Sequence, residues 1–318
     1  MIAELPAVSV VMSVHNGQKY LRDAVESILN QTFRNFEFIV IDDGSTDNSK
    51  EILEEYAAKD RRIRLISREN RGITKSLNEG SALARGEFIA HMDADDVSLP
   101  ERLVKQVAHL EKNQICVAVG GQALRIDCDG DPINVWEVPI SHETVDSHHI
   151  TGGVGGMIHP AVTIRLNALT DIGGYDERLS ASSDLDLWLR LAEVGELTNL
   201  PDVVLKYRVH FYSITMGKRL LQTNAANQVI SEARRRRKLP PGRLQDWSEW
   251  IHLPAWRIKE QWAIGAFTAG NYRTARKYAS AVVVARPWRL ESWRLLVRSL
   301  LVGRPRLVRA IRLVRFQR

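Results

Sequence analysis

Three acidic residues stand together in the run Asp93-Ala94-Asp95-Asp96. The mostly apolar residues 88–92 come directly before them, which is typical of a strand that leaves a hydrophobic core. Carboxylates this close repel one another unless a cation neutralises them. Oxygen-rich clusters suit Mg²⁺ or Mn²⁺, which bind one or two carboxylates together with substrate phosphates. The run therefore predicts a divalent-cation site, with an acidic loop before the helix at Pro100 as the alternative.

Two other polar clusters follow apolar runs. Ser13 and Asn16 stand at the end of the first run, and Asp42 and Asp43 stand at the end of the second. A carboxylate in such a position could hold a nucleobase or a ribose by hydrogen bonds. The alternative is that these acids only cap and solvate a loop.

The elements that must position these clusters alternate in type. Apolar runs predict strands over residues 8–14, 36–41, 63–66 and 87–92, and helical periodicity predicts helices over residues 17–31, 46–59, 73–84 and from Pro100 onward. This alternation predicts an α/β fold in which helices cover a parallel sheet whose strands end at one edge. Shorter strands beyond Ile115, with a hairpin at residues 127–132, predict that the sheet becomes mixed. We therefore expect the three polar clusters to meet at one edge of the sheet.

Charge divides the chain into two parts. Residues 1–217 carry 21 Lys and Arg against 33 Asp and Glu, whereas residues 218–318 carry 23 against 5, together with six of the tryptophans. We predict a catalytic domain at residues 1–216 and a basic, Trp-rich helical region at residues 217–318, with a tetratricopeptide-like helical hairpin at residues 263–287. Arg and Trp mixtures suit an anionic membrane interface, although packing within the region would also account for the tryptophans.

Composition is that of an ordinary globular protein, with 44% hydrophobic and 26% charged residues. The two cysteines, Cys116 and Cys128, form neither a disulfide framework nor a metal-ligand pattern, so a reducing cytoplasm is expected. No leader-like segment stands at the N-terminus, and no apolar run approaches the roughly 20 residues that span a bilayer. We expect any membrane association to be peripheral, on the inner membrane face.

Several motifs occur in a fixed order between residues 7 and 213. They are Val40-Ile-Asp-Asp-Gly-Ser-Thr-Asp47, Asn70-Arg-Gly72, Asp93-Ala-Asp-Asp96, His159-Pro160, Gly173-Gly-Tyr-Asp176, Asp184-Leu-Asp-Leu-Trp-Leu-Arg190 and Tyr207-Arg-Val-His210. In this order they resemble the family 2 glycosyltransferases. The resemblance implies a GT-A fold, the nucleotide-diphospho-sugar transferase fold with a mixed, mainly parallel central sheet.

The resemblance also assigns roles on the donor side. It implies that Ser13 and Asp43 contact the nucleotide base, that Asn16 shapes the same loop, and that the donor is a nucleoside diphosphate sugar, above all a UDP-sugar. Asp93 and Asp95 match the two acids of the family's DxD element, with Asp95 as the direct metal ligand and Asp93 nearer the ribose. Asp96 would be a third member of this acidic element.

The aspartate that serves the family as catalytic base matches Asp184. It would take the proton of an acceptor hydroxyl while that oxygen attacks the anomeric carbon, which inverts the configuration. The family usually has Glu before this Asp, but Ser183 stands here, so tuning of the base by that Glu is absent. The alternative is that Asp184 only caps a helix. His210 is expected to complete the metal shell or to touch the diphosphate.

The acceptor side is expected to include His159, Gly174 and Tyr175. Arg71 and Lys75 stand beside a predicted helix start, a setting that favours phosphate, although a solvated helix face would explain them equally well.

The predicted reaction is transfer of a hexose-type residue to a hydroxyl of a saccharide or lipid-linked acceptor, as in the synthesis of cell-surface polysaccharides. A nucleotidyltransferase would share the sheet and the metal, but the sequence has no Gly-rich phosphate loop with a Lys near the first strand. A nucleic-acid-binding protein would use the basic C-terminal region but leaves the acidic clusters without a role, so nucleic acid is not an expected partner.

Overall fold

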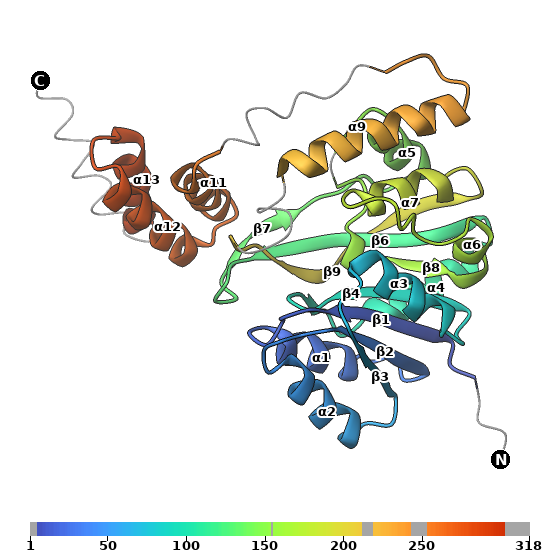
Figure 1. The fold of residues 1–318 in the computed structure, drawn as a ribbon. Helices are drawn as coiled ribbons and strands as arrows, with labels where there is room; N and C mark the ends of the chain where they lie inside the picture. Colours follow the sequence, from blue (N-terminus) through green and yellow to red (C-terminus); the bar gives the residue numbers. More distant parts are fainter. Residues whose placement is uncertain (1–4, 154, 212–218, 243–252, 303–318) are drawn as a thin grey trace, which may run out of the picture. The chain divides into compact units, whose positions relative to one another are not determined.

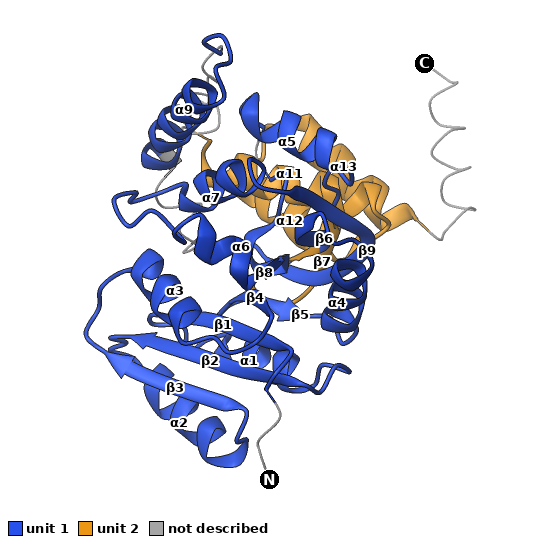
Figure 2. Cartoon of the chain, turned by 90° about the vertical axis from the view of Figure 1, so that its right-hand side faces the viewer, with its two compact units in different colours: residues 1–123, 136–246 blue, residues 124–135, 247–318 orange. Residues whose placement is uncertain are grey.

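The computed structural model describes residues 5–153, 155–211, 219–242 and 253–302. The chain forms two compact units, shown in different colours in Figure 2. Unit 1 comprises residues 1–123 and 136–246, and unit 2 comprises residues 124–135 and 247–318. No helix in the described ranges is long and apolar enough to cross a bilayer.

The central sheet has nine strands in the order β3-β2-β1-β4-β8-β6-β9-β5, with β7 paired to β6 (Figure 1). Their bounds are β1 Val8–Val14, β2 Phe36–Asp43, β3 Ile63–Arg68, β4 Phe88–Asp93, β5 Val97–Ser98, β6 Cys116–Ile126, β7 Pro132–Trp136, β8 Thr163–Arg165 and β9 Glu196–Arg208. The first four strands are parallel, while β8 runs antiparallel to both β4 and β6. The predicted mixed, mainly parallel sheet is therefore confirmed.

Helices cover both faces of this sheet. Their bounds are α1 Leu21–Leu29, α2 Ser49–Lys59, α3 Ile73–Ala82, α4 Arg102–Lys112, α5 His142–Ile150, α6 Leu166–Asp171, α7 Ser183–Leu191 and α9 Arg219–Arg236, with a short 3₁₀ turn, η1, at His159–Ala161. Several of these helices begin later than the apolar pattern predicts. Helix α1, for example, begins at Leu21 rather than at residue 17, because residues 17–20 form a turn.

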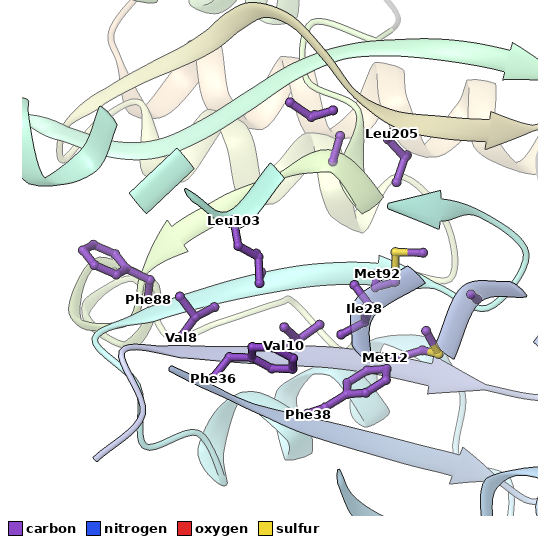
Figure 3. Close-up of a cluster of buried hydrophobic side chains, with 14 of the residues drawn as sticks. Val8, Val10, Met12, Ile28, Phe36, Phe38, Phe88, Met92, Leu103 and Leu205 are labelled. Carbon is purple, nitrogen blue, oxygen red and sulfur yellow. The ribbon is translucent and has the colours of Figure 1, made fainter. Parts of the chain in front are cut away.

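Alternation along the strands separates two hydrophobic layers. In β1, Val8, Val10 and Met12 face the layer covered by α1, α2 and α4, and Val11 faces the layer covered by α3, α5, α6 and α7. Figure 3 shows the first layer, where β1 side chains meet Ile28 of α1. Burial of both faces explains why these strands read as nearly continuous apolar runs. The acidic residues Asp42, Asp43 and Asp93 stand at the carboxyl ends of β2 and β4, where the candidate site lies.

Helix α9 belongs to unit 1. Its residues Val229, Ile230 and Ala233 pack with Ile150 and Leu189, which come from α5 and α7. The predicted domain boundary at residue 216 stays a prediction.

Unit 2 contains the helices α11 Ala255–Thr268, α12 Tyr272–Ala285 and α13 Leu290–Leu301. Helices α11 and α12 form a helical hairpin whose turn includes Gly270 at φ +80°, a backbone conformation that glycine adopts without strain. The turn between β6 and β7 also belongs to unit 2. Trp247, Trp250 and the basic segment 303–318 lie outside the described residues.

Candidate active site

The carboxyl ends of three neighbouring parallel strands bring the predicted clusters together. Ser13 near the end of β1 is in register with Asp93 of β4 on one side, and Val14 is in register with Asp42 of β2 on the other. The sequence prediction that Ser13, the Asp42-Asp43 pair and the acid run share one edge is therefore confirmed. Parallel sheets bind their ligands at this edge.

The acid run is closely packed. Asp93, Asp95 and Asp96 each offer an oxygen atom, and these three atoms lie within 4.8 Å of one another. The side chains of Asp93 and Asp95 are about a third exposed, whereas Asp96 is buried. Burial, with the charges of Asp95 and Asp184, raises the pKa of Asp93 to about 7. Burial, with the charges of Asp95 and Asp93, raises the pKa of Asp96 well above its ordinary value.

The end of β9 lies against the acid run. Strand β5 pairs antiparallel with β9, so the residues just before β5 meet those just after β9. The backbone N–H of Arg208 donates to Asp96 Oδ1 over 2.7 Å, and its guanidinium Nε donates to the carbonyl of Asp95 over 2.7 Å. His210 Nε2 lies 2.9 Å from Asp95 Oδ2. His210 is thus placed beside the carboxylate that the resemblance assigns to the metal.

These residues fit a divalent cation. Besides the three converging oxygens, Asp96 Oδ2 is buried and has no hydrogen-bond partner in the described part of the chain. A buried carboxylate oxygen without a partner costs stability, and a bound cation would remove that cost. Burial and the crowding of like charges raise the pKa values of Asp93 and Asp96. A bound cation would relieve the same crowding.

Asp43 holds the loop that precedes α3. It is buried, and its oxygens accept the backbone N–H groups of Arg71 over 2.8 Å and of Gly72 over 2.9 Å. Arg68 donates to it as well. Burial alone would raise the pKa of Asp43, but the Arg71 amide, the Arg68 guanidinium and the Gly72 amide hold it below its ordinary value. A contact between Asp43 and the nucleotide base stays a prediction.

Asn16 joins the loops after β1 and β2. It adopts a left-handed backbone conformation with φ 54°. Its backbone N–H donates to Ser45 Oγ, and its Oδ1 accepts the backbone N–H of Thr46 over 2.8 Å. Ser13 is partly buried, and the side chains of Arg71 and Lys75 are exposed near the start of α3. The structure leaves their predicted roles in nucleotide binding as predictions.

Asp184 lies in the first turn of α7 and is exposed. Ser182, just before this helix, has φ 55° and no side-chain capping bond, and Asp184 Oδ1 accepts the N–H of Leu185 over 2.9 Å. Burial, with the charges of Asp184 and Asp93, raises the pKa of Tyr175 well above its ordinary value.

A buried aromatic network lies beside the acid run. Tyr175 is 2% exposed, and its hydroxyl lies 2.7 Å from His159 Nε2 and 2.9 Å from His91 Nε2. The rings of His91 and His159 stack at 4.8 Å. The other nitrogen of His159, Nδ1, lies 3.9 Å from Asp93 Oδ1. Tyr175 is therefore placed to orient His159 toward the acid run.

Gly174 supports this network through close packing. Its φ is +70°, and an added Cβ would lie 2.7 Å from Asn78 Oδ1. The same amide group of Asn78 accepts the N–H of Tyr175 over 2.9 Å and donates to its carbonyl over 3.0 Å. A direct role of Gly174 in acceptor binding stays a prediction.

Sequence analysis missed Arg102 and Gln106 of α4, both buried. Arg102 donates to the carbonyls of His91 over 2.8 Å and of Pro160 over 2.6 Å. It therefore ties the strand that carries Asp93 to the 3₁₀ turn that carries His159. Burial lowers the pKa of Arg102 to about 9, against the opposing charges of Asp96 and Asp93, so the side chain remains a cation at neutral pH. In the sequence, Arg102 resembles any surface arginine of an amphipathic helix, so only the polar His91 within an apolar strand gave a sign of this arrangement.

The site thus consists of carboxylates gathered at the carboxyl ends of parallel strands in a mixed, mainly parallel sheet. The family described as Glycosyl transferase family 2 matches residues 9–173. An uncharacterized glycosyltransferase of Methanocaldococcus jannaschii is 34% identical over 221 residues, covering 66% of this chain and 73% of that protein. This chain belongs to the family 2 glycosyltransferases.

Solved structures agree with this fold. A mannosyltransferase from Pyrobaculum calidifontis, in complex with GDP-Man and Mn²⁺, has a TM-score of 0.59 at 19% identity, covering 94% of this chain and 87% of that one. Residues 1–349 of TarS from S. aureus, in complex with UDP, have a TM-score of 0.55 at 19% identity, covering 93% of this chain and 92% of that one. Asp184 and His210 lie beyond the residues that the family match covers.

Proposed function

We propose that this chain is a metal-dependent, inverting glycosyltransferase that moves a sugar from a nucleoside diphosphate sugar to a hydroxyl of a saccharide or lipid-linked acceptor, in the synthesis of cell-surface polysaccharides. The observation that carries the proposal is the meeting of Asp93, Asp95 and Asp96 with His210 beyond the carboxyl ends of parallel strands. The UDP and GDP-Man in the two related structures support a nucleoside diphosphate sugar, with a UDP-sugar as the first candidate.

Mn²⁺ or Mg²⁺ is the proposed cofactor. Asp95 and Asp93 are partly exposed and would hold the ion, with His210 beside Asp95 and Asp96 behind them. The ion would neutralise the negative charge that develops on the leaving diphosphate. The Mn²⁺ bound by the related mannosyltransferase supports this assignment.

Asp184 is the proposed general base. The acceptor hydroxyl oxygen forms a bond to the anomeric carbon while its proton passes to the Asp184 carboxylate. The bond between the anomeric carbon and the diphosphate oxygen breaks on the opposite side, and the nucleoside diphosphate leaves with the electron pair. Attack from the side opposite the leaving group inverts the anomeric configuration. The exposure of Asp184 supports this role, because the acceptor must reach it.

Other residues of the site are assigned by position. We propose that Ser13, Asn16 and Asp43 form the nucleotide pocket, with Arg71 and Lys75 near the diphosphate. His159, oriented by Tyr175, would contact the acceptor side. For the location of the reaction, we propose the cytoplasm at the inner membrane face, with the chain bound peripherally, which the excess of basic residues in the C-terminal region supports.

An assay of nucleoside diphosphate release over a panel of donor sugars tests the function, with Mn²⁺ and Mg²⁺ compared against a chelator. Asp184→Asn should lower transfer by about 1,000-fold, because the proton acceptor is lost. It should leave the donor dissociation constant, measured by titration calorimetry, within about twofold of the original value.

Asp171→Asn is the matched control, because Asp171 is also exposed and lies in a neighbouring helix of the same unit. It should keep full transfer. If Asp184→Asn transfers sugar as fast as the unsubstituted enzyme, the base is another residue. Release of pyrophosphate in place of nucleoside diphosphate would instead indicate nucleotidyl transfer.

A further inference from the structure

Helix α13 presents four of its large apolar residues to solvent. Leu290 is 66% exposed, Trp293 43%, Val297 42% and Leu300 50%. These residues recur at intervals of three and four, so they form one stripe along the helix. An amphipathic helix of a globular protein normally buries such a stripe, so the exposed face requires an explanation.

The opposite face of α13 is the one that packs. Ser292 and Ser299 are buried, and the carbonyl of Ser299 accepts a hydrogen bond from Arg276 of α12 over 3.2 Å. Helices α12 and α13 lie side by side within unit 2 (Figure 1). The small serines allow this close packing. The apolar stripe is therefore not part of the core formed by α11 and α12.

Arginines flank the stripe. Arg294 and Arg298 follow Trp293 and Val297 directly, and both are exposed. Residues 253–302 carry nine Lys and Arg against two Glu, and residues 303–318 add six Arg and no acid. Arginine side chains can lay their apolar stems beside an inserted stripe while their charged groups reach phosphate.

We propose that the exposed face of α13 is a membrane-docking surface that lies in the headgroup region of a bilayer containing anionic phospholipid. Apolar residues beside arginines are the features that such a surface requires. A second copy of the chain would bring the same arginines together, so charge disfavours self-association through this face. The proposal rests on the peripheral location proposed above and is independent of the transfer chemistry.

Sedimentation of the full chain with vesicles tests this surface. Vesicles of equal parts phosphatidylglycerol and phosphatidylcholine should bind the chain, and vesicles of phosphatidylcholine alone should bind it at least about tenfold more weakly. Replacing Arg294 and Arg298 by Gln should weaken binding by about 30-fold, since each basic residue near an anionic surface contributes about 1 kcal/mol.

Leu290→Glu with Val297→Glu should also release the chain from anionic vesicles. The matched control is Ile115→Glu, because Ile115 is 70% exposed but lies in unit 1. It should bind vesicles like the unsubstituted chain. All variants should keep their circular dichroism spectrum and their rate of nucleoside diphosphate release without vesicles, which separates failure of docking from failure of the proposed catalysis.

Three results would overturn the proposal. The first is equal binding to neutral and anionic vesicles. The second is a pair of results: the α13 variants bind vesicles as before, and replacement of Arg306, Arg309 and Arg312 by Gln releases the chain. The basic segment 303–318 would then be the membrane anchor. The third is a concentration-dependent dimer that the Leu290→Glu and Val297→Glu pair dissolves, since the stripe would then contact a second copy.

Discussion

Two acid-rich turns of this chain have similar spacing and opposite surroundings. The run Asp93-Ala94-Asp95-Asp96 lies at the edge of the central sheet, where its carboxylates meet His210, His159 and a backbone amide. The turn between β6 and β7, Asp127-Cys128-Asp129-Gly130-Asp131, belongs to unit 2. There the ammonium of Lys277 lies 2.5 Å from Asp127 Oδ2, 2.6 Å from Asp129 Oδ2 and 3.2 Å from Asp131 Oδ2.

The difference shows how one pattern serves two purposes. In unit 2 a side chain of the protein itself neutralises the acids, and Tyr278 donates a further hydrogen bond to Asp127 over 2.9 Å. These bonds fasten α12 to the turn. In the active site the guanidinium groups of Arg102 and Arg208 donate to backbone carbonyls, and Asp96 Oδ2 has no partner among the described residues. Acids satisfied by their own chain hold structure together, whereas acids left short of positive charge can bind a ligand.

The largest expected effect comes from the active-site acids. Asp95→Asn should lower transfer by about 1,000-fold or more, about 4 kcal/mol, because a metal-holding carboxylate and the partner of His210 are lost together. Steady-state assays with Mn²⁺ and Mg²⁺ measure this. Asp129→Asn is the control from the second turn and should leave transfer unchanged. An equal loss of transfer activity in both variants would contradict the assignment of one acidic turn to ligand binding and the other to structure.

Lys277→Met should destabilise unit 2 by about 3 kcal/mol, because the fully buried Asp127 carboxylate would lose the ammonium group that neutralises its charge. Urea unfolding measures this. The variant should also gain stability from added Ca²⁺, because three carboxylates are then open to a cation. Arg273→Gln is the matched control, since Arg273 lies on the same helix but is 86% exposed. If Ca²⁺ stabilises the unsubstituted chain as much as the Lys277→Met variant, the Lys277 ammonium does not take the place of a bound cation.

Arg102→Gln should lower kcat by about 100-fold, about 2.7 kcal/mol, with little change in the donor KM. The reason is that β4 and the 3₁₀ turn would no longer hold Asp93 and His159 in place. Arg102→Lys should recover part of the loss, because it restores the charge without the full set of hydrogen bonds. If the variant yields less folded protein but the folded molecules keep a normal kcat, Arg102 has only a structural role.

The smallest effect is expected for the stability of Asp129→Asn. Asp129 is 64% exposed, so its ion pair with Lys277 should contribute less than about 1 kcal/mol. Thermal unfolding measures this. A larger loss would mean that the exposed acid is as necessary for the turn as the buried Asp127.

Local patterns predicted much of the fold and of the site. Apolar runs located β1, β2 and β4 because both faces of those strands are buried. The polar ends of the same runs predicted that Ser13, Asp43 and Asp93 share an edge. The GT-A fold followed from the order of the motifs. The acid run was predictable because three adjacent carboxylates are an unusual feature in any sequence.

Contacts between distant residues were not predictable in this way. Lys277 is 150 residues from Asp127 in the sequence, and the residues around either one do not indicate that the two are in contact. Arg102 is an ordinary member of its local sequence, and only the tertiary structure brings it and Tyr175 beside His91 and His159. The packing of α9 on α5 and α7 was hidden for the same reason, since a helical pattern does not identify the surface that will cover it.

Unit 2 takes one of its pieces, residues 124–135, from the middle of the chain. A gene shortened after residue 246 would therefore lose the helices but keep the hairpin. That hairpin would carry Asp127 without Lys277 and Tyr278, and Ile133 without the amide of Asn271 that bonds to its carbonyl. The hairpin and the C-terminal helices are therefore one structural unit, although they come from separate stretches of the gene.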